Sequence, residues 1–356
     1  MTGEEVEINA ALAAAGIVPI ETDFGEMICQ LAGVPPSHVT APVIDWSIEQ
    51  IDELLVRAGI ASPSTAPLAD DAARRARAAE LVGAARKALR GRFLSADLGV
   101  SGANFAVAES GSLVLVENEG NIRLSTALPR THVAIVGIDK LIPRLADLGL
   151  FLTLLPVSAT GQRQTTYVSL LHRPIGRLEI VLLDNGRTRV LADPRQYDLL
   201  SCIRCGACMN VCPVYRQVSG HAYGGVYPGP IGAVLQPHLR GVEWYGALPF
   251  ASSLCGACSE TCPVAIPLHE RLLEWRQRLA GAGQIGVAKR AALRAWSWWM
   301  DHPRVYRALR PPAWLIDALA QLLPVGWRWS QGREMPRAAR ESFGQWWSRT
   351  HGPSAD

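Results

Sequence analysis

Cysteine is the residue type whose spacing in this chain most directly suggests chemistry. Seven of the eight cysteines lie in two segments, which we call box 1 (residues 202–213) and box 2 (residues 252–263). Box 1 reads Cys202-x-x-Cys205-x-x-Cys208-x-x-x-Cys212-Pro213. Box 2 ends in a shorter copy, Cys255-x-x-Cys258-x-x-x-Cys262-Pro263. Three thiolates at successive short gaps can surround one iron–sulfur cluster, whereas zinc ribbons use separated cysteine pairs, so the spacing favours iron–sulfur over zinc.

The two boxes together predict two clusters with exchanged ligands. In two-cluster ferredoxins each box gives three ligands to its own cluster, and the Cys before Pro crosses to the other cluster. The predicted ligands of cluster 1 are therefore Cys202, Cys205, Cys208 and Cys262. Those of cluster 2 are Cys212, Cys255 and Cys258. Since soft thiolates suit iron–sulfur clusters, the predicted cofactors are two clusters, most simply of the 4Fe–4S type.

Box 2 lacks one thiolate, because Ser252 stands three residues before Cys255. Three possibilities stay open for cluster 2. The first is a 3Fe–4S cluster. The second is a 4Fe–4S cluster whose fourth ligand is Ser252, another side chain or a group from a partner. The third is a 4Fe–4S cluster with one open iron. An open iron could act as a Lewis acid on a hydroxy acid. The alternative is that Ser252 is only a loop residue and that the cluster serves electron transfer alone.

Other polar residues are candidates for substrate binding or for support of the clusters. Glu109 lies in a turn between two apolar runs and could be a catalytic carboxylate or simply a solvated turn residue. The polar residues 158–166 could line a site or form a surface connection. His221 and His269 lie near the boxes and could ligate a cluster or hydrogen-bond around it. Cys29, in an apolar stretch, is predicted to be a buried thiol.

The elements that must position these residues follow from hydrophobic periodicity. Helices are predicted over residues 48–57 and 70–90. Apolar, β-branched runs predict strands at 16–20, 105–108, 112–116, 132–138, 151–155, 167–171 and 178–183. Strands mixed with helices predict an α/β domain over residues 1–190, ended by turn signals from residue 184 onward.

The second half of the chain is predicted to be mainly helical around the clusters. A two-cluster, ferredoxin-type domain is expected over residues 191–285, with irregular chain over the Gly- and Pro-rich residues 221–232 and a helix from 268 to about 282. Residues 286–356 are rich in Trp, including Trp327 and Trp329, and in Arg, and several prolines divide them into short helices. Trp and Arg often anchor interfaces, so this segment could contact a partner or a membrane surface, or pack on the cluster domain.

Composition excludes several functional classes. The formal charge of +3 is too close to neutral to predict nucleic-acid binding, and 49% hydrophobic residues suit a globular protein. The start of the sequence lacks a signal-peptide pattern, and no apolar run is long enough to cross a membrane. A cytoplasmic location is therefore expected, with at most peripheral membrane association. In that compartment closely spaced cysteines are typically metal ligands.

Taken with the boxes, several segments make the chain resemble the iron–sulfur subunits of bacterial L-lactate utilisation systems. They are residues 21–26 (ETDFGE), 30–38 (QLAGVPPSH), 104–112 (NFAVAESGS), 128–132 (LPRTH), 158–162 (SATGQ) and 221–232, together with the serine at position 252. The resemblance implies an α/β domain like those of sugar isomerases and CoA-transferases. It also implies an electron-transfer role in oxidising L-lactate to pyruvate, beside a cysteine-rich subunit and a second subunit with the same α/β domain.

The resemblance leaves the donor and the acceptor open. Lactate, glycolate or another hydroxy acid could supply electrons, and a quinone or a soluble carrier could receive them. The rival hypothesis is a hydroxy-acid-binding subunit whose cluster 2 acts as a Lewis acid. Members of the family usually carry a further segment before the point matched by Met1, so the α/β domain is expected to be truncated. A parallel sheet without its first strands exposes an apolar edge, so poor solubility of the isolated chain is expected.

Overall fold

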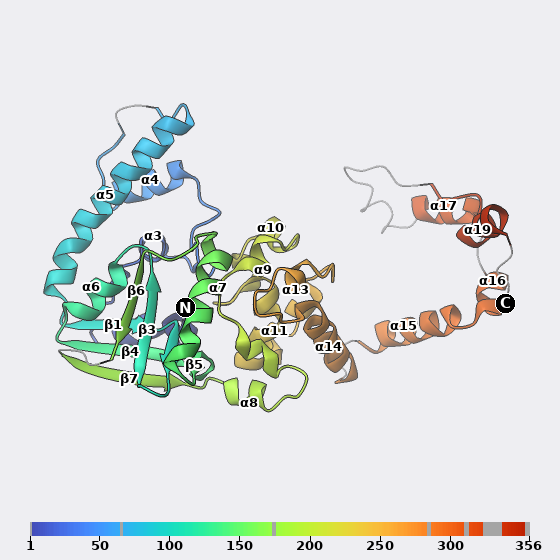
Figure 1. Cartoon of the computed structure of the whole chain (residues 1–356). Helices are drawn as coiled ribbons and strands as arrows, with labels where there is room; N and C mark the ends of the chain where they lie inside the picture. Colours follow the sequence, from blue (N-terminus) through green and yellow to red (C-terminus); the bar gives the residue numbers. More distant parts are fainter. Residues whose placement is uncertain are drawn as a thin grey trace. The chain divides into compact units, whose positions relative to one another are not determined.

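The structure is a computed structural model that describes residues 2–64, 67–172, 176–282, 286–309, 313–322 and 337–352. The chain divides into two units, Met1–Gly281 and Ala282–Asp356. The first unit holds the α/β region and both cysteine boxes, whereas the second holds the Trp-rich helices (Figure 1). The α/β and cluster regions are therefore packed together rather than joined as separate units.

Two sheets form the centre of the α/β region. The parallel sheet has the order β1 (Leu98–Gly102), β4 (Thr131–Gly137), β7 (Arg177–Leu183). The mixed sheet has the order β5 (Leu141–Ile142), β2 (Phe105–Val107), β3 (Ser112–Glu117), β6 (Tyr167–Leu171). Strands β2 and β3 form an antiparallel hairpin whose turn includes Gly111 at φ 65°, a left-handed conformation that glycine adopts without strain. The predicted α/β architecture is confirmed.

Helices flank these sheets throughout the α/β region. They are α1 (Thr2–Glu5), α2 (Ile8–Ala14), α3 (Phe24–Ala32), α4 (Ile48–Arg57), α5 (Asp71–Ser95), α6 (Asn121–Ala127), α7 (Leu148–Thr160) and α8 (Arg187–Leu191), with short 3₁₀ turns η1 (Ile138–Lys140) and η2 (Leu145–Asp147). Ser47 and Gln50 form a capping box at the start of α4, and Asp70 caps α5. The predicted helices over 48–57 and 70–90 are thus confirmed.

Two strand predictions are wrong. Residues 17–20 have no regular structure, and the Val18 side chain is 80% exposed. No strand in the described part of the chain pairs with them. Residues 151–155 lie inside helix α7, which ends at Gly161 in a left-handed C-cap. A short apolar run has the same composition in a buried strand and in a buried helix, so its pattern could not distinguish the two.

Short helices surround the cysteine boxes. They are η3 (Tyr197–Ser201), α9 (Ala207–Asn210), α10 (Tyr215–Val218), η4 (His221–Tyr223), α11 (Gly229–Leu239), α12 (Val242–Tyr245), η5 (Leu248–Phe250), α13 (Ala257–Glu260) and α14 (Leu268–Gly281). Residues 229–232 were expected to be irregular, but they begin α11. Pro230 is tolerated there because the first helical turn needs no N–H donor.

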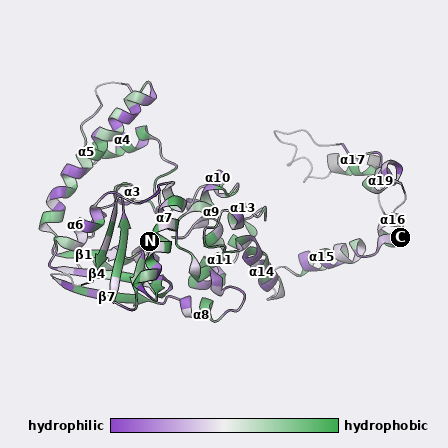
Figure 2. Cartoon of the chain, viewed as in Figure 1, coloured by the Kyte–Doolittle hydropathy of each residue, from purple (hydrophilic) through white to green (hydrophobic). Residues whose placement is uncertain are grey.

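Helix α11 forms the core of the cluster region. Nearly all its residues are buried, and it packs against α14 through Val234, Leu235, Leu272 and Trp275. The Trp275 indole donates a hydrogen bond of 2.9 Å to the Val234 carbonyl. Figure 2 shows hydrophobic residues concentrated in the strands and around α11, whereas hydrophilic and hydrophobic residues alternate along α5.

The second unit is helical, as predicted. It contains α15 (Val287–Met300), α16 (Pro303–Leu309), α17 (Ala313–Leu322) and α19 (Phe343–His351). Its aromatic residues pack on one another, for example Trp347 on His351 at 4.0 Å between ring centroids. Trp327 and Trp329, which the sequence placed in this segment, lie outside the described residues. None of the helices that the structure describes combines the length and apolar character needed to cross a membrane.

Strand β7 is an edge strand with exposed apolar side chains. Ile180, Val181 and Leu182 are 42%, 47% and 56% exposed. An unpaired strand edge of this kind can associate with other chains. The low solubility expected from the sequence stays a prediction.

Candidate iron–sulfur site

Cys202 and Cys205 lie in a loop with two left-handed residues, and Cys208 lies in the helix that follows it. Arg204 has φ 61° and Gly206 has φ 80°, and α9 follows directly. Left-handed residues reverse the chain sharply, so the thiols can turn toward a common space. The Arg204 backbone N–H donates to Cys202 Sγ at 3.4 Å, a contact that also orients the thiol.

One pocket brings four cysteines together. It is lined by Cys202, Cys205 and Cys208 of box 1 and by Cys262 of box 2. These are the four residues that the sequence predicted for cluster 1. The rest of the lining is mainly apolar and includes Val39, Ile203, Met209, Ile231, Val264, Ile266 and Leu268. The pocket therefore combines a thiol donor set with walls that exclude water.

The donors fit an iron–sulfur cluster. Burial raises the pKa of the Cys205, Cys208 and Cys262 thiols, so their thiolates need a positive partner such as iron. Four thiols spaced around one pocket are the arrangement that a four-cornered cube needs.

The remaining three box cysteines, Cys212, Cys255 and Cys258, differ in exposure. Cys212 and Cys258 are buried, whereas Cys255 is exposed. Burial raises the pKa of Cys258, and the charges of the Cys212 and Cys255 thiols raise it further. In contrast, amide and hydroxyl hydrogen bonds lower the pKa of Cys255. Cluster 2 thus has a predicted site with an exposed side.

Ser252 accepts a hydrogen bond on Oγ from the backbone N–H of Leu254 at 3.1 Å. Its carbonyl accepts from the Arg276 guanidinium at 2.8 Å. Hydrogen bonds therefore fix both the side chain and the backbone of Ser252.

The other candidate residues lie outside the pocket lining. Glu109 is exposed and accepts from the Leu145 backbone N–H at 3.0 Å, so it caps η2. Residues 158–166 pair with the end of β3 through Asn118, which accepts from the Thr166 backbone N–H at 3.0 Å. Residues 158–160 form the last turn of α7, and residues 161–166 connect α7 to β6.

The two histidines and Cys29 also have structural partners. His269 Nδ1 and the Ser259 hydroxyl are 2.7 Å apart, and His221 Nε2 lies 3.7 Å from Asp45. Neither histidine lines the four-cysteine pocket. Cys29 is 3% exposed, and burial raises its pKa to about 12, which confirms the predicted buried thiol.

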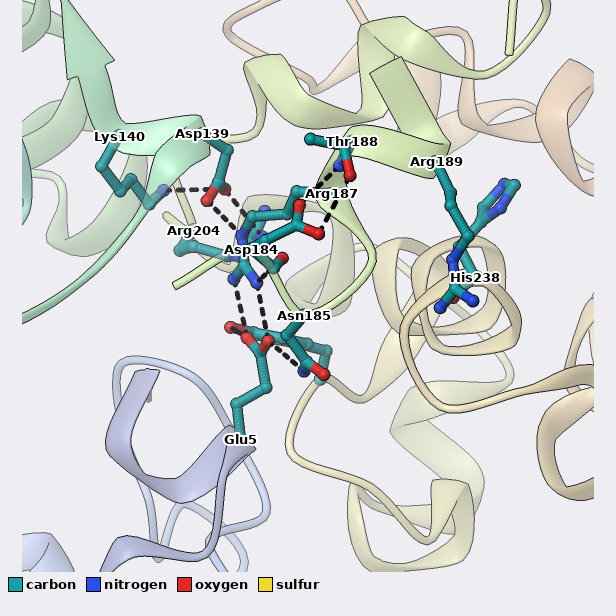
Figure 3. A network of polar contacts seen from close by, with 11 residues as sticks. Glu5, Asp139, Lys140, Asp184, Asn185, Arg187, Thr188, Arg189, Arg204 and His238 are labelled. Carbon is teal, nitrogen blue, oxygen red and sulfur yellow. Dashed lines mark hydrogen bonds and ion pairs between the residues drawn. The ribbon is translucent and has the colours of Figure 1, made fainter. Parts of the chain in front are cut away.

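A buried network of charges adjoins Cys202, and the sequence analysis missed it (Figure 3). Lys140 Nζ donates to the Cys202 carbonyl at 2.9 Å, and Arg204 donates to the same oxygen at 3.3 Å. Arg204 also pairs with Asp139 at 3.2 Å and lies 4.7 Å above the Tyr227 ring. Burial, with Arg204 nearby, lowers the pKa of Lys140 to about 8. Two cations therefore lie beside the predicted cluster 1.

The network continues to the first residues of the chain. Arg187 donates to both carboxylate oxygens of Glu5, at 2.7 and 2.8 Å, and to Asp139 at 2.5 Å. Tyr227 and Asn185 each donate to Glu5 at 2.6 Å. Although burial acts to raise the pKa of Glu5, Arg187 and these hydrogen bonds hold it below its ordinary value. The network joins α1, η1, α8 and box 1.

Comparison with known proteins identifies three family models along the chain. They are the LUD domain over residues 4–190, the 4Fe-4S dicluster domain over 198–266, and the lactate utilisation protein B C-terminal model over 277–351. Lactate utilization protein B of Geobacillus kaustophilus is 40% identical over 97% of this chain and 74% of its own length. The Shouchella clausii protein of the same name is 41% identical over the same shares.

The chain belongs to the lactate utilization protein B family. An Escherichia coli relative named "uncharacterized electron transport protein YkgF" is 40% identical over 98% of this chain and 74% of its own length. As a lactate utilization protein B family member with a dicluster domain, the chain has iron–sulfur clusters as cofactors, as predicted. The predicted α/β domain, ferredoxin-type domain and helical C-terminus are likewise confirmed.

In this lactate utilization protein B family member, a loop of the LUD domain covers box 1. Val39 lines the four-cysteine pocket, and the Ser37 carbonyl accepts from the Tyr215 hydroxyl at 2.7 Å. Asp45 accepts from the hydroxyls of Ser37 and Ser219, at 2.8 and 2.7 Å. The sequence pattern of residues 30–38 does not reveal this contact, because its partners lie far away in the chain. The loop ties the two domains together beside the pocket.

Proposed function

We propose that this chain is the iron–sulfur electron-transfer subunit of a complex that oxidises L-lactate to pyruvate. The observation that carries the proposal is the pocket that combines Cys202, Cys205 and Cys208 with Cys262. A thiol set drawn from both boxes is the ligand pattern of two-cluster electron carriers. The family's name and the electron-transport name of one relative support the same role.

In this proposal, Cys202, Cys205, Cys208 and Cys262 hold cluster 1, and Cys212, Cys255 and Cys258 hold cluster 2. Bound clusters supply one-electron redox chemistry. Two of them suit a two-electron donor, since each accepts one electron at a time. The chain's own residues bind the clusters, exclude water with apolar walls, and offset negative charge through Lys140 and Arg204.

The proposed electron path runs between a buried side and an exposed side. Ile203 and Cys205 belong to the core that contains Phe105 and Val107 of β2, so cluster 1 adjoins the LUD domain. Cys255 is exposed, so cluster 2 can approach a partner closely. We place electron entry on one of these sides and exit on the other.

The proposed setting is a cytoplasmic, multi-subunit lactate-utilisation system. Its other members would be a cysteine-rich subunit and a second subunit with a LUD-type domain, and an electron acceptor of unassigned chemistry would complete it. The family's name supports the lactate-utilisation system. The cytoplasm fits because metal-binding cysteines must stay reduced, and that compartment keeps thiols reduced.

A second function is favoured by one observation, the exposed side of a site with three thiols. In that alternative, the chain itself binds the hydroxy acid at cluster 2, where an open iron would act as a Lewis acid. The two functions differ in whether substrate perturbs the cluster.

Anaerobic reconstitution of the full chain tests the proposal. We expect about eight irons and eight sulfides per chain and reduction by dithionite to paramagnetic clusters. Cys205→Ala should remove cluster 1, whereas Cys29→Ala, a matched control at another buried thiol, should leave both clusters. Added L-lactate should leave the electron paramagnetic resonance (EPR) spectrum unchanged; a lactate-dependent change would favour the Lewis-acid alternative. Absence of any iron–sulfur signal would refute both.

A further inference from the structure

The backbone of box 2 repeats that of box 1 position by position. Leu254 at φ 56° and Gly256 at φ 85° precede and follow Cys255, just as Arg204 at φ 61° and Gly206 at φ 80° flank Cys205. A four-residue helix starts after the glycine in each box, α9 in box 1 and α13 in box 2. Left-handed non-glycine residues are uncommon, so two at equivalent positions indicate a shared local fold. In this alignment Ser252 is equivalent to Cys202.

The hydrogen bonds of the two loops repeat as well. Cys202 Sγ accepts from the N–H two residues later, that of Arg204, at 3.4 Å. Ser252 Oγ accepts from the N–H two residues later, that of Leu254, at 3.1 Å. The Ser252 hydroxyl therefore has the local position of a cluster-1 ligand.

A cation holds the carbonyl of each first residue. The Cys202 carbonyl accepts from Lys140 and Arg204, and the Ser252 carbonyl accepts from Arg276 at 2.8 Å. Arg276 also donates to the Pro249 carbonyl at 2.8 Å, which fixes the preceding turn. A Ser turn alone accounts for the Oγ contact. It does not account for the matching backbone and the matching cation.

We propose that Ser252 Oγ is the fourth ligand of cluster 2, which makes this a 4Fe–4S cluster with three thiolates and one oxygen. The inference rests on the proposed two-cluster function. When Oγ binds iron, the hydroxyl O–H bond breaks and its proton leaves to solvent, with no change of oxidation state. The Leu254 N–H stabilises the resulting alkoxide through a charge-assisted hydrogen bond. Because oxygen is a harder donor than sulfur, it favours the oxidised cluster and lowers the reduction potential.

Three variants of the full chain, reconstituted without oxygen, test this ligand. Ser252→Ala should reduce the iron content from about eight to about seven per chain and produce the EPR signal of an oxidised three-iron cluster. Ser252→Cys should keep about eight irons and raise the reduction potential of cluster 2. Ser95→Ala, which removes an exposed hydroxyl at the end of α5, should keep the wild-type iron content. Potentials are read by redox titration followed by EPR.

Several results would overturn the assignment. They are a wild-type chain with about seven irons, or a Ser252→Ala variant with wild-type iron content, spectrum and potential. If Ser252→Ala does not fold, the Ser252→Cys variant provides the test, because the equivalent residue in box 1, Cys202, is a cysteine. A cluster-2 reduction potential equal to that of the wild type would then show that Ser252 is not a ligand. A wild-type chain without clusters would instead refute the proposed function itself.

Discussion

The Lys140 ammonium group donates a 2.9 Å hydrogen bond to the backbone carbonyl of Cys202. The lysine comes from η1, directly after β4 of the LUD domain, and the cysteine begins box 1. The contact brings a buried charge from one domain to the proposed cluster of the other. Reduction of a cluster adds negative charge, so a nearby cation should make reduction easier.

Lys140→Met should therefore lower the reduction potential of cluster 1. At an effective dielectric constant of about 20 and a separation of about 8 Å, one charge contributes about 2 kcal/mol, or roughly 90 mV for one electron. Redox titration followed by EPR measures the shift. Lys87→Met removes an exposed lysine on α5 and should leave the potential unchanged. Equal potentials in both variants would contradict a role for Lys140.

The buried pair of Arg187 and Glu5 should be important for stability. Both side chains are 2% exposed, and Arg187 also neutralises Asp139. Arg187→Met would leave two carboxylates buried without this partner, and we expect a loss of about 3–5 kcal/mol in urea unfolding. Arg177→Met breaks an ion pair with Glu179 between exposed side chains and should cost at most about 1 kcal/mol. Similar losses of stability in the two variants would contradict the prediction that the buried pair contributes more than the exposed pair.

His238 should make the protein sensitive to mild acid. Burial lowers its pKa from 6.5 to about 4, with Asp193 opposing this shift and Arg278 and Arg189 adding to it. Between these values the unfolded chain binds a proton that the folded chain does not, so stability falls as the pH falls from 6.5 toward 4.

His238→Phe keeps a ring against Trp275, which lies 4.6 Å from the histidine ring, but cannot titrate. Relative to wild type, the variant should gain about 2 kcal/mol of stability on going from about pH 6.5 to about pH 4.5. Urea unfolding at both pH values measures this difference. His172→Phe, at an exposed site, should gain little. A constant difference between His238→Phe and wild type across this range would contradict the prediction.

Gly232 should not tolerate a side chain. An added Cβ would lie 1.6 Å from the Tyr227 carbonyl oxygen, and both residues are buried. Gly232→Ala should cost about 3 kcal/mol or more and disturb the Tyr227 contacts to Glu5 and Arg204. Gly91→Ala, in α5 with nothing within 4 Å of its added Cβ, should instead stabilise by about 0.5–1 kcal/mol. Thermal unfolding compares the two, and equal melting temperatures would refute the steric argument.

Local patterns predicted much of the fold. The helix over residues 48–57 and the strand over 167–171 have the predicted bounds, because periodicity and capping act over neighbouring residues. The error at residues 151–155 arose where a short apolar run carried no local distinction between helix and strand. Helix α11 was missed in part because its burial, rather than its Gly- and Pro-rich start, stabilises it.

The sequence by itself determined the chemistry of the boxes, because cysteine spacing along a loop limits which thiols can reach one cluster. It also identified Ser252 as the position without a thiolate. Only the tertiary structure brought Lys140 to Cys202 and Arg187 to Glu5, which are 62 and 182 residues apart. Likewise, only the structure revealed that Ser252 Oγ has the backbone setting of a ligand. Such contacts depend on how distant elements pack, and no local pattern of residues encodes them.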